Sequence, residues 1–469
     1  MSTETIEKEE EEEGTLQTGL QKVVVVVGPT GTGKSRLALE LAAWLGRGAA
    51  VVNADAMQCY AGLATLTNQA SAAERARVPH HCLAHRDALA PAPYDVRHWT
   101  ADADRAIATI AARGGTPVVV GGTHYYIEAL LWRNVLSLNE GKDEGQDKEK
   151  DDDEDKKEET EATATASWIK TLEDKSNEEV HAMLEAVDPV TAARLHPNNR
   201  RKVVRALQVA RATGQPLSAH LHAQRTGPRR PHARYSPLVL WVDYADLAAL
   251  DARLDARVDA MAAGPMFAEI AALRRRWRAT HAPAERPDFE RGLFQAIGLR
   301  QLWDAVPEDA VPEDAGTEGG AGTMATASDG VDAALAAMKQ ATRRYARQQR
   351  RWLANRLART HGGVLQRLVV HDPAHWDAEV LAPAQAAVTE FLRGGPLRAP
   401  EEAGCAEEED DDGARVWTPR TCAACKRTLH GDAEWAAHTR SMRHKTNVKR
   451  ARLAAQRSSS STQTESPIE

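Results

Sequence analysis

The chain has 469 residues, 42% of them hydrophobic, which is enough for about three domains with buried cores. Its five cysteines are too few for a disulfide framework, and no run of 18 apolar residues offers a membrane-spanning helix. The formal net charge of −7 conceals blocks of opposite sign, because residues 339–370 hold nine Lys or Arg and no acid. Such a basic stripe is typical of a protein with a polyanionic partner.

The N-terminal sequence MSTETIEKEEEEE is acidic and has no apolar core, unlike a secretory signal or an Arg-rich transit peptide. Cysteines without a disulfide pattern suit a reducing compartment. We therefore expect a cytoplasmic monomer without membrane contact, with the nucleus as a second location. This N-terminus does not support a mitochondrial form.

A glycine-rich stretch, GPTGTGKS, follows the apolar run Val23–Val27 and precedes a helix-like stretch at 36–45. In this order of strand, turn and helix, the pattern binds phosphate, because glycines let backbone N–H groups approach an anion at a helix N-terminus. The alternative is an accidental glycine turn. The pattern predicts a site for a diphosphate or triphosphate, formed by Gly28, Thr30, Gly31, Thr32, Gly33, Lys34 and Ser35.

Strand-like and helix-like stretches alternate in the first half of the chain. Residues 49–53, 117–120 and 237–242 have strand character, whereas 97–113 and 246–278 have helical character, the latter with a Gly-Pro interruption. This alternation predicts an α/β fold with a P-loop parallel sheet and helices on both faces. Ligands of such sheets bind at the carboxyl ends of the strands, where this chain has polar motifs.

Composition divides the chain into further parts. The predicted core covers 20–134 and 236–395, with an inserted helical domain at 163–235. Residues 139–161 hold thirteen acids and five lysines, which predicts a disordered insertion over 139–162. A zinc finger is predicted at 415–457. The other segments predicted to lack structure are the acidic tail 1–19, the insertion 305–330, the acidic linker 396–414 and the tail 458–469.

Three polar residues stand at the predicted strand ends. Asp55 suits a general base or a Mg²⁺ ligand, and its alternative is a solvated loop acid. Gln58 suits the edge of a nucleic-acid base, and Thr123 suits a phosphate oxygen. An ordinary turn residue and a plain loop threonine are the alternatives for these two.

Arg253 and Arg257 are four residues apart and so share one helix face. They suit a clamp on a diphosphate opposite the glycine-rich loop. They equally suit ion pairs with Asp251, Asp255 or Asp259, and the local pattern alone favours these surface pairs.

The segment RRYARQQRRWLANR lies in a predicted basic helix at 333–359. Its arginines, with Tyr345 and Trp352 between them, suit an RNA backbone with an option for base stacking. A solvated basic face is the alternative, and it is disfavoured because the segment holds no balancing acid.

Cys422 and Cys425 are followed by His438 and His444 in the spacing C-x2-C-x12-H-x5-H. Two thiolates and two imidazoles in this spacing predict a closed, structural Zn²⁺ site in a ββα finger. Many basic residues surround the motif, which indicates a nucleic-acid partner.

Together these motifs resemble the tRNA dimethylallyltransferases, also called tRNA isopentenyltransferases, and the finger resembles that of their eukaryotic branch. The resemblance covers most of residues 22–360. The segments that carry it are Gly28–Ser35, Asp55–Tyr60, Thr67–Gln69, Val78–His81, Gly121–Tyr126, Asp188–Pro197, Arg201–Lys202, Arg205–Leu207, Arg253–Arg257, Gln295–Gly298 and Thr342–Arg356.

The resemblance implies transfer of a dimethylallyl group from dimethylallyl diphosphate to N6 of the tRNA adenosine 3′-adjacent to the anticodon, at position 37. The glycine-rich loop would hold the diphosphate with Mg²⁺, and Asp55 would take the N6 proton. Lys34 and Thr123 complete the implied catalytic set. The tRNA-binding residues that it implies are Asp55, Ala56, Met57, Gln58, Arg201, Lys202, Arg205, Gln295, Arg343, Arg344, Arg347, Arg350 and Arg351.

Two residues depart from the family pattern: Ala56 replaces a serine and Gln69 replaces a lysine. A small-molecule P-loop kinase or NTPase is one rival reading, but it explains neither the basic helix nor the finger. A non-catalytic RNA-binding protein is another, against which the intact Lys34, Asp55 and Thr123 argue.

Overall fold

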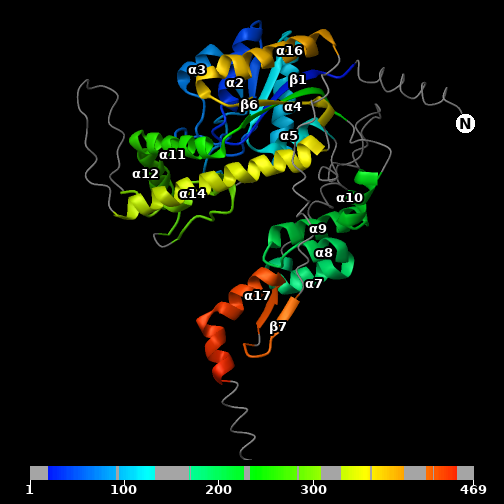
Figure 1. Ribbon diagram of the computed structural model, residues 1–469, viewed down its shortest axis with the longest axis vertical. Coiled ribbons are helices and arrows are strands. Elements are labelled where there is room, and N and C mark those ends of the chain that lie inside the picture. The colour runs from blue at the N-terminus through cyan, green and yellow to red at the C-terminus, as the bar shows by residue number, and fades with distance from the viewer. Residues whose placement is uncertain are drawn as a thin grey trace, which may run out of the picture. The chain divides into compact units, whose positions relative to one another are not determined.

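A computed structural model of the chain shows two compact units, Met1–Asn134 with Pro231–Gly404, and Val135–Arg230 with Cys405–Glu469 (Figure 1). The described residues are 19–90, 94–132, 168, 171–226, 233–282, 285–307, 329–359, 362–395, 419–425 and 427–450. The predicted segments 1–19, 139–162, 396–414 and 458–469 lie outside these residues, apart from Gly19. No helix among the described residues is long and apolar enough to cross a membrane.

A six-stranded parallel sheet forms the centre of the first unit, with the strand order β3-β2-β4-β1-β5-β6. The prediction of an α/β fold with a parallel sheet is therefore confirmed. The strands are β1 (Lys22–Val27), β2 (Ala50–Asn53), β3 (His80–His81), β4 (Pro117–Gly121), β5 (Ser236–Tyr244) and β6 (Leu365–Val370). Sequence patterning missed β3 because two residues make no pattern, and β6 because this edge strand is only half buried.

The valines of β1 are fully buried on both faces of the sheet. Side chains alternate along a strand, so Val24 and Val26 face one side, and the other valines of β1 face the opposite side. Helices α2 (Lys34–Leu45) and α16 (Ala382–Arg393) cover the first side. Helices α4 (Val96–Ala112) and α5 (His124–Leu131) cover the second (Figure 1). A strand covered on both sides needs an unbroken apolar sequence, which is why VVVVV is the centre of the fold.

The predicted helical stretches 246–278 and 333–359 of the first unit are helical, whereas the short helices at 72–77 and 299–302 and the turns at 373–381 were not predicted. The Gly-Pro interruption separates α11 from α12, as predicted. The predicted insertion 305–330 is too long at both ends, because Val306 is buried and its carbonyl accepts a hydrogen bond from Arg274, and α14 already begins at Asp329. The elements are α3 (Ala72–Arg77), α11 (Leu247–Ala263), α12 (Met266–Arg278), η2 (Gly292–Gln295), α13 (Leu299–Leu302), α14 (Asp329–Trp352), the π-helical turn η3 (Leu353–Ala358), η4 (Gly362–Val364), η5 (Pro373–His375) and η6 (Asp377–Leu381).

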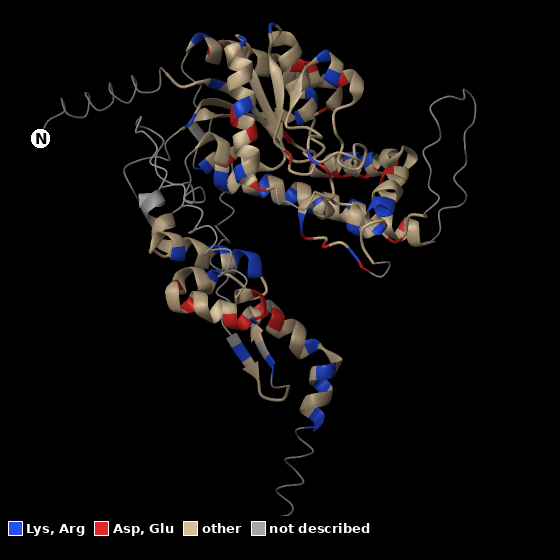
Figure 2. Ribbon diagram, turned by 180° about the vertical axis from the view of Figure 1, so that it is seen from behind, with Lys and Arg blue, Asp and Glu red and all other residues tan. Residues whose placement is uncertain are grey.

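A row of ion pairs joins α11 to the basic helix α14, whose Lys and Arg appear as blue bands in Figure 2. The Lys339 ammonium lies 2.6 Å from Asp259, Arg343 pairs with Asp255, and Arg347 pairs with Asp251. Both sets are spaced by four residues, so each occupies one helix face. Two predictions are corrected here. The acids of α11 do not pair with Arg253 and Arg257, and the basic helix is balanced by acids that lie far away in sequence.

The second unit contains a small helical core and a ββα finger, and its helical character is as predicted. Asp188 is buried between two helices and accepts hydrogen bonds from the Thr191 and Ser218 backbone N–H groups at 3.0 and 2.8 Å. It therefore ends α7 and starts α8, which is why a carboxylate can be buried at this position. The elements are α7 (Asn177–Val187), α8 (Pro189–Arg194), α9 (Arg200–Thr213), α10 (Leu217–Thr226), β7 (Pro419–Cys422), β8 (Arg427–His430) and α17 (Gly431–Arg440).

Candidate active site and metal centre

The glycine-rich loop turns between the end of β1 and the first turn of α2. Gly31 and Gly33 have φ angles of 85° and 94°, in the left-handed region that favours glycine. A Cβ at Gly31 would lie 2.6 Å from the Leu254 side chain, and one at Gly33 would lie 2.6 Å from Trp376. Thr32 is buried, and its hydroxyl donates to the Pro29 carbonyl at 2.9 Å. The glycine-rich loop thus lies between a strand and a helix as predicted, and packing on both sides fixes its shape.

Asp55 lies two residues beyond the end of β2, at the carboxyl edge of the sheet. The Asn53 side chain holds its backbone on both sides, because Oδ1 accepts from the Asp55 N–H at 3.1 Å and Nδ2 donates to the Asp55 carbonyl at 3.1 Å. The Met57 N–H donates to Asp55 Oδ1 at 3.0 Å. One carboxylate oxygen is therefore oriented by the backbone. The carboxylate is held in place, as a general base must be.

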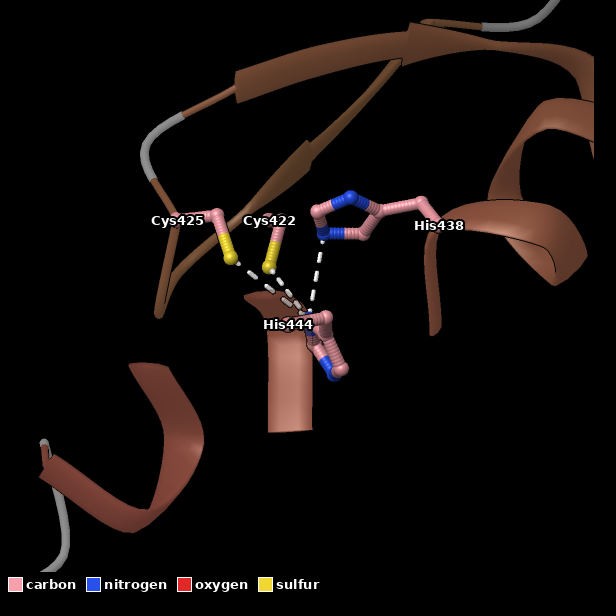
Figure 3. A group of neighbouring side chains, drawn as sticks. All are labelled: Cys422, Cys425, His438 and His444. Carbon is pink, nitrogen blue, oxygen red and sulfur yellow. Dashed lines mark hydrogen bonds between the residues drawn. The ribbon is translucent and has the colours of Figure 1, made fainter. Parts of the chain in front are cut away.

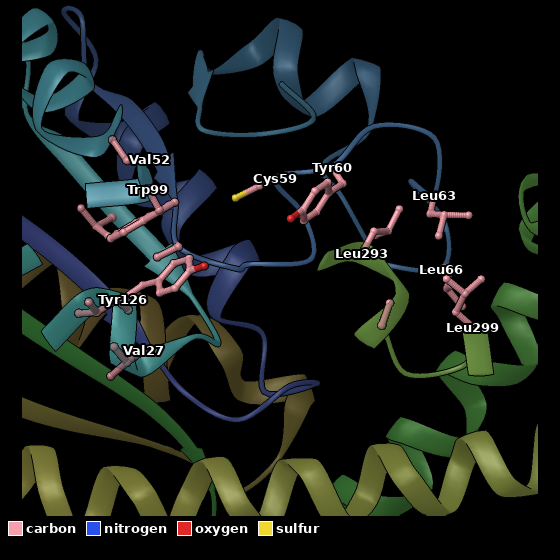
Figure 4. Packing of buried hydrophobic residues seen from close by; sticks show 14 of the residues in the cluster. Val27, Val52, Cys59, Tyr60, Leu63, Leu66, Trp99, Tyr126, Leu293 and Leu299 are labelled. Carbon is pink, nitrogen blue, oxygen red and sulfur yellow. The ribbon is translucent and has the colours of Figure 1, made fainter. Parts of the chain in front are cut away.

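The loop after Asp55 is anchored by apolar burial (Figure 4). Its side chains join the core that extends from the sheet to η2 and α13. The contributing residues of the loop are Cys59, Tyr60, Leu63 and Leu66, and those they pack with include Leu293 and Leu299.

The Gly121–Thr123 turn at the end of β4 lies against the same segment. A Cβ at Gly121 would come within 2.1 Å of the Ala54 backbone, so only glycine fits. The Thr123 N–H donates to the Ala54 carbonyl at 3.2 Å, and its Oγ1 accepts from the Ala56 N–H at 2.9 Å. Thr123 thus fixes the chain on both sides of Asp55, while its hydroxyl proton can still be donated to a phosphate oxygen.

The structure explains how both departures from the family pattern are accommodated. Ala56 contacts Thr123 through its backbone N–H, which does not depend on the missing serine hydroxyl. Gln69 donates its side-chain amide to the Tyr60 carbonyl at 2.7 Å and so stabilises the loop that follows Asp55.

Three cationic side chains converge on this region. Arg253 donates from Nε to the Gly31 carbonyl at 2.8 Å, so it reaches the phosphate loop. Removal from water lowers the pKa of Lys34 to about 8, against the attraction of Asp55 and with a smaller contribution from Arg257. Burial also lowers the pKa of Arg257, with Asp55 opposing and Arg253 adding to the effect. The diphosphate clamp predicted for the two arginines therefore agrees with their positions.

Positive charge exceeds negative charge in this group, because Asp55 interacts with both Lys34 and Arg257, and Arg253 adds a third cation beside Arg257. Among the described residues, the buried Nε of Arg257 has no hydrogen-bond partner. Buried cationic donors are costly unless they are paired. This arrangement is suited to an anionic ligand with several oxygens.

His124 is buried behind the glycine-rich loop, with its ring stacked on Trp352 at a centroid distance of 5.3 Å. Burial, and secondarily the Lys34 charge, lower its pKa to about 3, so its imidazole is neutral at pH 7. A hydrogen bond with the Gly28 backbone opposes this shift.

Replacing His124 with phenylalanine should reduce the acid sensitivity of the fold. In the wild type the unfolded chain binds a proton near pH 6.5 and the folded chain near pH 3, so stability is complete above pH 6.5 and falls as the pH drops toward 3. In this range, titration of His124 changes the free energy of unfolding by up to about 1.4 kcal/mol per pH unit. Urea unfolding of both proteins between pH 4 and 7 measures it. Equal slopes would contradict the assignment of a neutral buried imidazole.

The inward face of α14 carries a residue that sequence analysis missed, Gln349. Its side-chain Oε1 accepts from the Thr30 N–H at 2.8 Å, and its Nε2 donates to the Gly122 carbonyl at 2.9 Å. The Thr30 N–H is therefore directed to Gln349 in this structure. The available signal was that Gln349 falls in a stripe with Thr342, Ala346 and Leu353, all buried at helical spacing.

Tyr345 and Trp352, the two rings with a predicted option for base stacking, are both half-buried. Burial raises the pKa of Tyr345, and the negative charge of Asp55 raises it as well. The Tyr345 ring therefore lies near Asp55. Trp352 stacks on His124. Neither ring is presented as an exposed platform for RNA bases.

The structure separates the arginines of α14 that were predicted to bind tRNA. Arg343 and Arg347 pair with α11, and Arg350 pairs at 3.0 Å with the fully buried Asp243. Ion pairing within the core unit thus accounts for these three. Arg344 and Arg351 are exposed.

The other residues predicted to bind tRNA lie in different environments. The Gln58 amide donates to the Thr67 and Asn68 carbonyls, both at 3.0 Å, so its donors are used within the loop. Gln295 is exposed at the end of η2. In the second unit, α9 exposes Arg201 and Lys202 and partly buries Arg205.

Four ligand-type atoms meet in the finger (Figure 3). Those of Cys422, Cys425, His438 and His444 all lie within 4.8 Å of one another. The His444 Nδ1 is 3.5 and 3.6 Å from the two sulfurs and 3.1 Å from the His438 Nε2. A tetrahedral Zn²⁺ site has sulfur–nitrogen edges of about 3.5 Å, so the four residues fit this metal. The Asn447 amide donates to the Cys425 sulfur at 3.4 Å, a second contact that orients a ligand.

Comparison with known proteins identifies the family of the chain. The sequence model of the family described as IPP transferase matches residues 58–356, and that described as isopentenyl transferase matches 21–87. The chain is 36% identical to the tRNA dimethylallyltransferases of Mus musculus and Homo sapiens, over 92% of this chain and 86% and 88% of theirs. A solved structure of a eukaryotic dimethylallyltransferase acting on tRNA has 27% identity and a TM-score of 0.67, over 94% of this chain and 99% of that one. With the phosphate loop, Asp55 and the Cys2His2 group in place, the chain belongs to the IPP transferase family.

Proposed function

We propose that the protein transfers a dimethylallyl group from dimethylallyl diphosphate to N6 of the adenosine at position 37 of tRNA. The observation that carries this proposal is that Lys34 and Arg257 interact with Asp55 at the carboxyl edge of the sheet, while Arg253 reaches the adjoining glycine-rich loop. The cations suit a diphosphate leaving group, and the carboxylate suits a proton acceptor. Family membership supplies the substrate class.

The reaction needs one bond formed and one broken. The adenine N6 attacks C1 of the allyl group, a nitrogen–carbon bond forms, and the carbon–oxygen bond to the diphosphate breaks with its electron pair on oxygen. Asp55 accepts the N6 proton, so the product amine is neutral. Lys34, Arg257 and Arg253 neutralise the charge that grows on the departing diphosphate, where electrostatic stabilisation is most effective.

The Thr123 hydroxyl donates to the same diphosphate while its oxygen holds the Asp55 segment through the Ala56 N–H. The exposed Ser35 hydroxyl at the start of α2 would hold Mg²⁺, which would supply further charge neutralisation for the diphosphate. The adenine must leave the stack of the anticodon loop to reach Asp55.

Mass spectrometry of tRNA nucleosides tests this function. Purified protein, unmodified tRNA and dimethylallyl diphosphate should yield N6-isopentenyladenosine at position 37. A P-loop kinase would instead be stabilised against heat by ATP rather than by dimethylallyl diphosphate, and a non-catalytic RNA-binding protein would bind tRNA without product. Either result would overturn the proposal.

We infer that the finger increases tRNA affinity without taking part in the chemistry. Its four ligands complete a tetrahedral shell, so no position is left for a substrate. Deleting residues 415–469 should raise the apparent KM for tRNA and flatten its dependence on salt, because phosphate contacts are lost. The kcat at saturating tRNA should stay near that of the full chain.

Steady-state kinetics at several salt concentrations measure these effects. Two milder changes should have the same effects on KM and salt dependence as the deletion. One is Cys422→Ser, which removes one metal ligand from the intact chain, and the other is chelation of zinc. A fall in kcat with unchanged KM for tRNA would show that the finger helps to form the active site.

A further inference from the structure

We propose that Gln349 is a positioning residue that joins the phosphate loop to the Gly122–Thr123 turn and thereby holds the two halves of the active site in register. This inference rests on the proposed function. The side chain is only 4% exposed, and both ends of its amide are used. The oxygen accepts from the Thr30 N–H at 2.8 Å and the nitrogen donates to the Gly122 carbonyl at 2.9 Å.

The two hydrogen bonds join segments that come from different strands. Thr30 follows β1, and Gly122 follows β4, its neighbour in the sheet. Below these turns the strands are fixed by the sheet, but beyond the strand ends no strand pairing holds them. A single amide can bridge the turns because a glutamine carries both a donor and an acceptor.

Gly122 brings the bridge next to the proposed base. A Cβ at Gly122 would lie 2.5 Å from Gln349 Nε2 and 3.5 Å from Asp55 Oδ2, so both side chains lie against this residue. The next residue, Thr123, holds the Ala56 N–H at 2.9 Å. A shift of the Gly122–Thr123 turn would therefore move Asp55 relative to the phosphate loop. Displacements of about 1 Å at a catalytic group can reduce rates by about 10²-fold.

The helix that carries Gln349 is itself anchored. The neighbouring Arg350 pairs at 3.0 Å with Asp243, a fully buried carboxylate that also accepts from Arg367 at 2.6 Å. Asp243 lies in β5, on the other side of β1, so α14 is attached to three neighbouring strands. The ion pairs with α11 add to this attachment. The position of Gln349 relative to the strand ends is consequently fixed.

Replacing Gln349 with methionine removes both hydrogen bonds and keeps the volume. We expect kcat/KM for dimethylallyl diphosphate to fall about 10- to 100-fold, with the apparent KM for tRNA unchanged. Hydrogen exchange at the Thr30 amide should become faster, a readout that needs no activity. The matched control is Gln348→Met, because Gln348 is the adjacent residue of α14 and is exposed. Its kinetics and its Thr30 exchange should equal those of the wild type.

Replacing Gln349 with glutamate distinguishes positioning from general stabilisation of α14. Glutamate keeps the acceptor for the Thr30 N–H but has no donor for the Gly122 carbonyl, so it breaks only one side of the bridge. The kcat should fall as in Gln349→Met, whereas hydrogen exchange at the Thr30 amide should stay near that of the wild type. This variant keeps the hydrogen bond to Thr30 and so tests the proposal even if Gln349→Met does not fold.

Two results would overturn the inference. One is a Gln349→Met variant with wild-type kcat/KM and wild-type Thr30 exchange. The other is a Gln349→Glu variant with the kcat of the wild type. If the wild type and Gln348→Met form no isopentenyladenosine, the proposed function fails, whereas Thr30 exchange still decides whether Gln349 holds the loop.

Discussion

Replacing Asp55 with asparagine should lower the rate of prenyl transfer by about 10²–10⁴-fold while tRNA binding is kept, because removal of a positioned base typically has an effect of this size. Asparagine has the same shape and can still accept from the Met57 N–H, which donates to Asp55 Oδ1 at 3.0 Å. The local fold should therefore remain, and the loss should appear in kcat. Single-turnover kinetics with saturating tRNA measure it directly.

The matched control is Asp377→Asn, which removes an acid of the same unit whose side chain is 83% exposed. Its rate should equal that of the wild type. An Asp55→Asn enzyme with a rate within a few-fold of the wild type would remove Asp55 from its role as the base. A loss of tRNA affinity equal to the loss of rate would instead make Asp55 a binding residue.

Replacing Lys34 with methionine should lower kcat/KM for dimethylallyl diphosphate by about 10²–10³-fold, the usual effect of removing one group that stabilises transition-state charge. It should also change the dependence on pH. In the free enzyme the pKa of Lys34 is lowered to about 8. As the pH rises through 8, wild-type Lys34 loses its charge and kcat/KM falls, since this parameter reports the free enzyme.

The alkaline fall near pH 8 should be absent in Lys34→Met, whose lower activity has no Lys34 charge to lose. Lys339→Met is the control, because Lys339 pairs with Asp259 on α11, away from the phosphate loop. It should keep both the rate and the alkaline limb. A limb near pH 8 that persists in Lys34→Met would assign that titration to another group.

Much of the active site is determined by local sequence. The Gly28–Ser35 pattern needs only a strand before it and a helix after it, and both are set by short-range periodicity. Asp55 and Gly121–Thr123 follow buried strands, and parallel topology brings such strand ends to one edge. The metal ligands of the finger are likewise fixed by spacing, since a small ββα unit is held together by its metal.

The partners of charged residues were decided only by tertiary structure. The sequence placed Asp251, Asp255 and Asp259 near Arg253 and Arg257, whereas α14, about 90 residues away along the chain, provides their actual partners. Short-range sequence patterns do not reveal the partner of a charged residue, because an ion pair depends on which helix faces are brought together. Because the acids of α11 pair with α14, the side chains of Arg253 and Arg257 are available to the glycine-rich loop.

The role of α14 shows the same division. Its periodicity predicts a basic helix, and its charge suggests an outer surface that binds RNA. The fold instead directs one face to α11 and another, with Tyr345 and Gln349, into the active site. What the sequence determined by itself was the glycine-rich loop, the place of Asp55 beyond a strand end and the Cys2His2 group, because strand and helix periods and ligand spacing are local. Which side chains complete the site was decided by tertiary structure, because a buried hydrogen bond joins residues that only packing brings together.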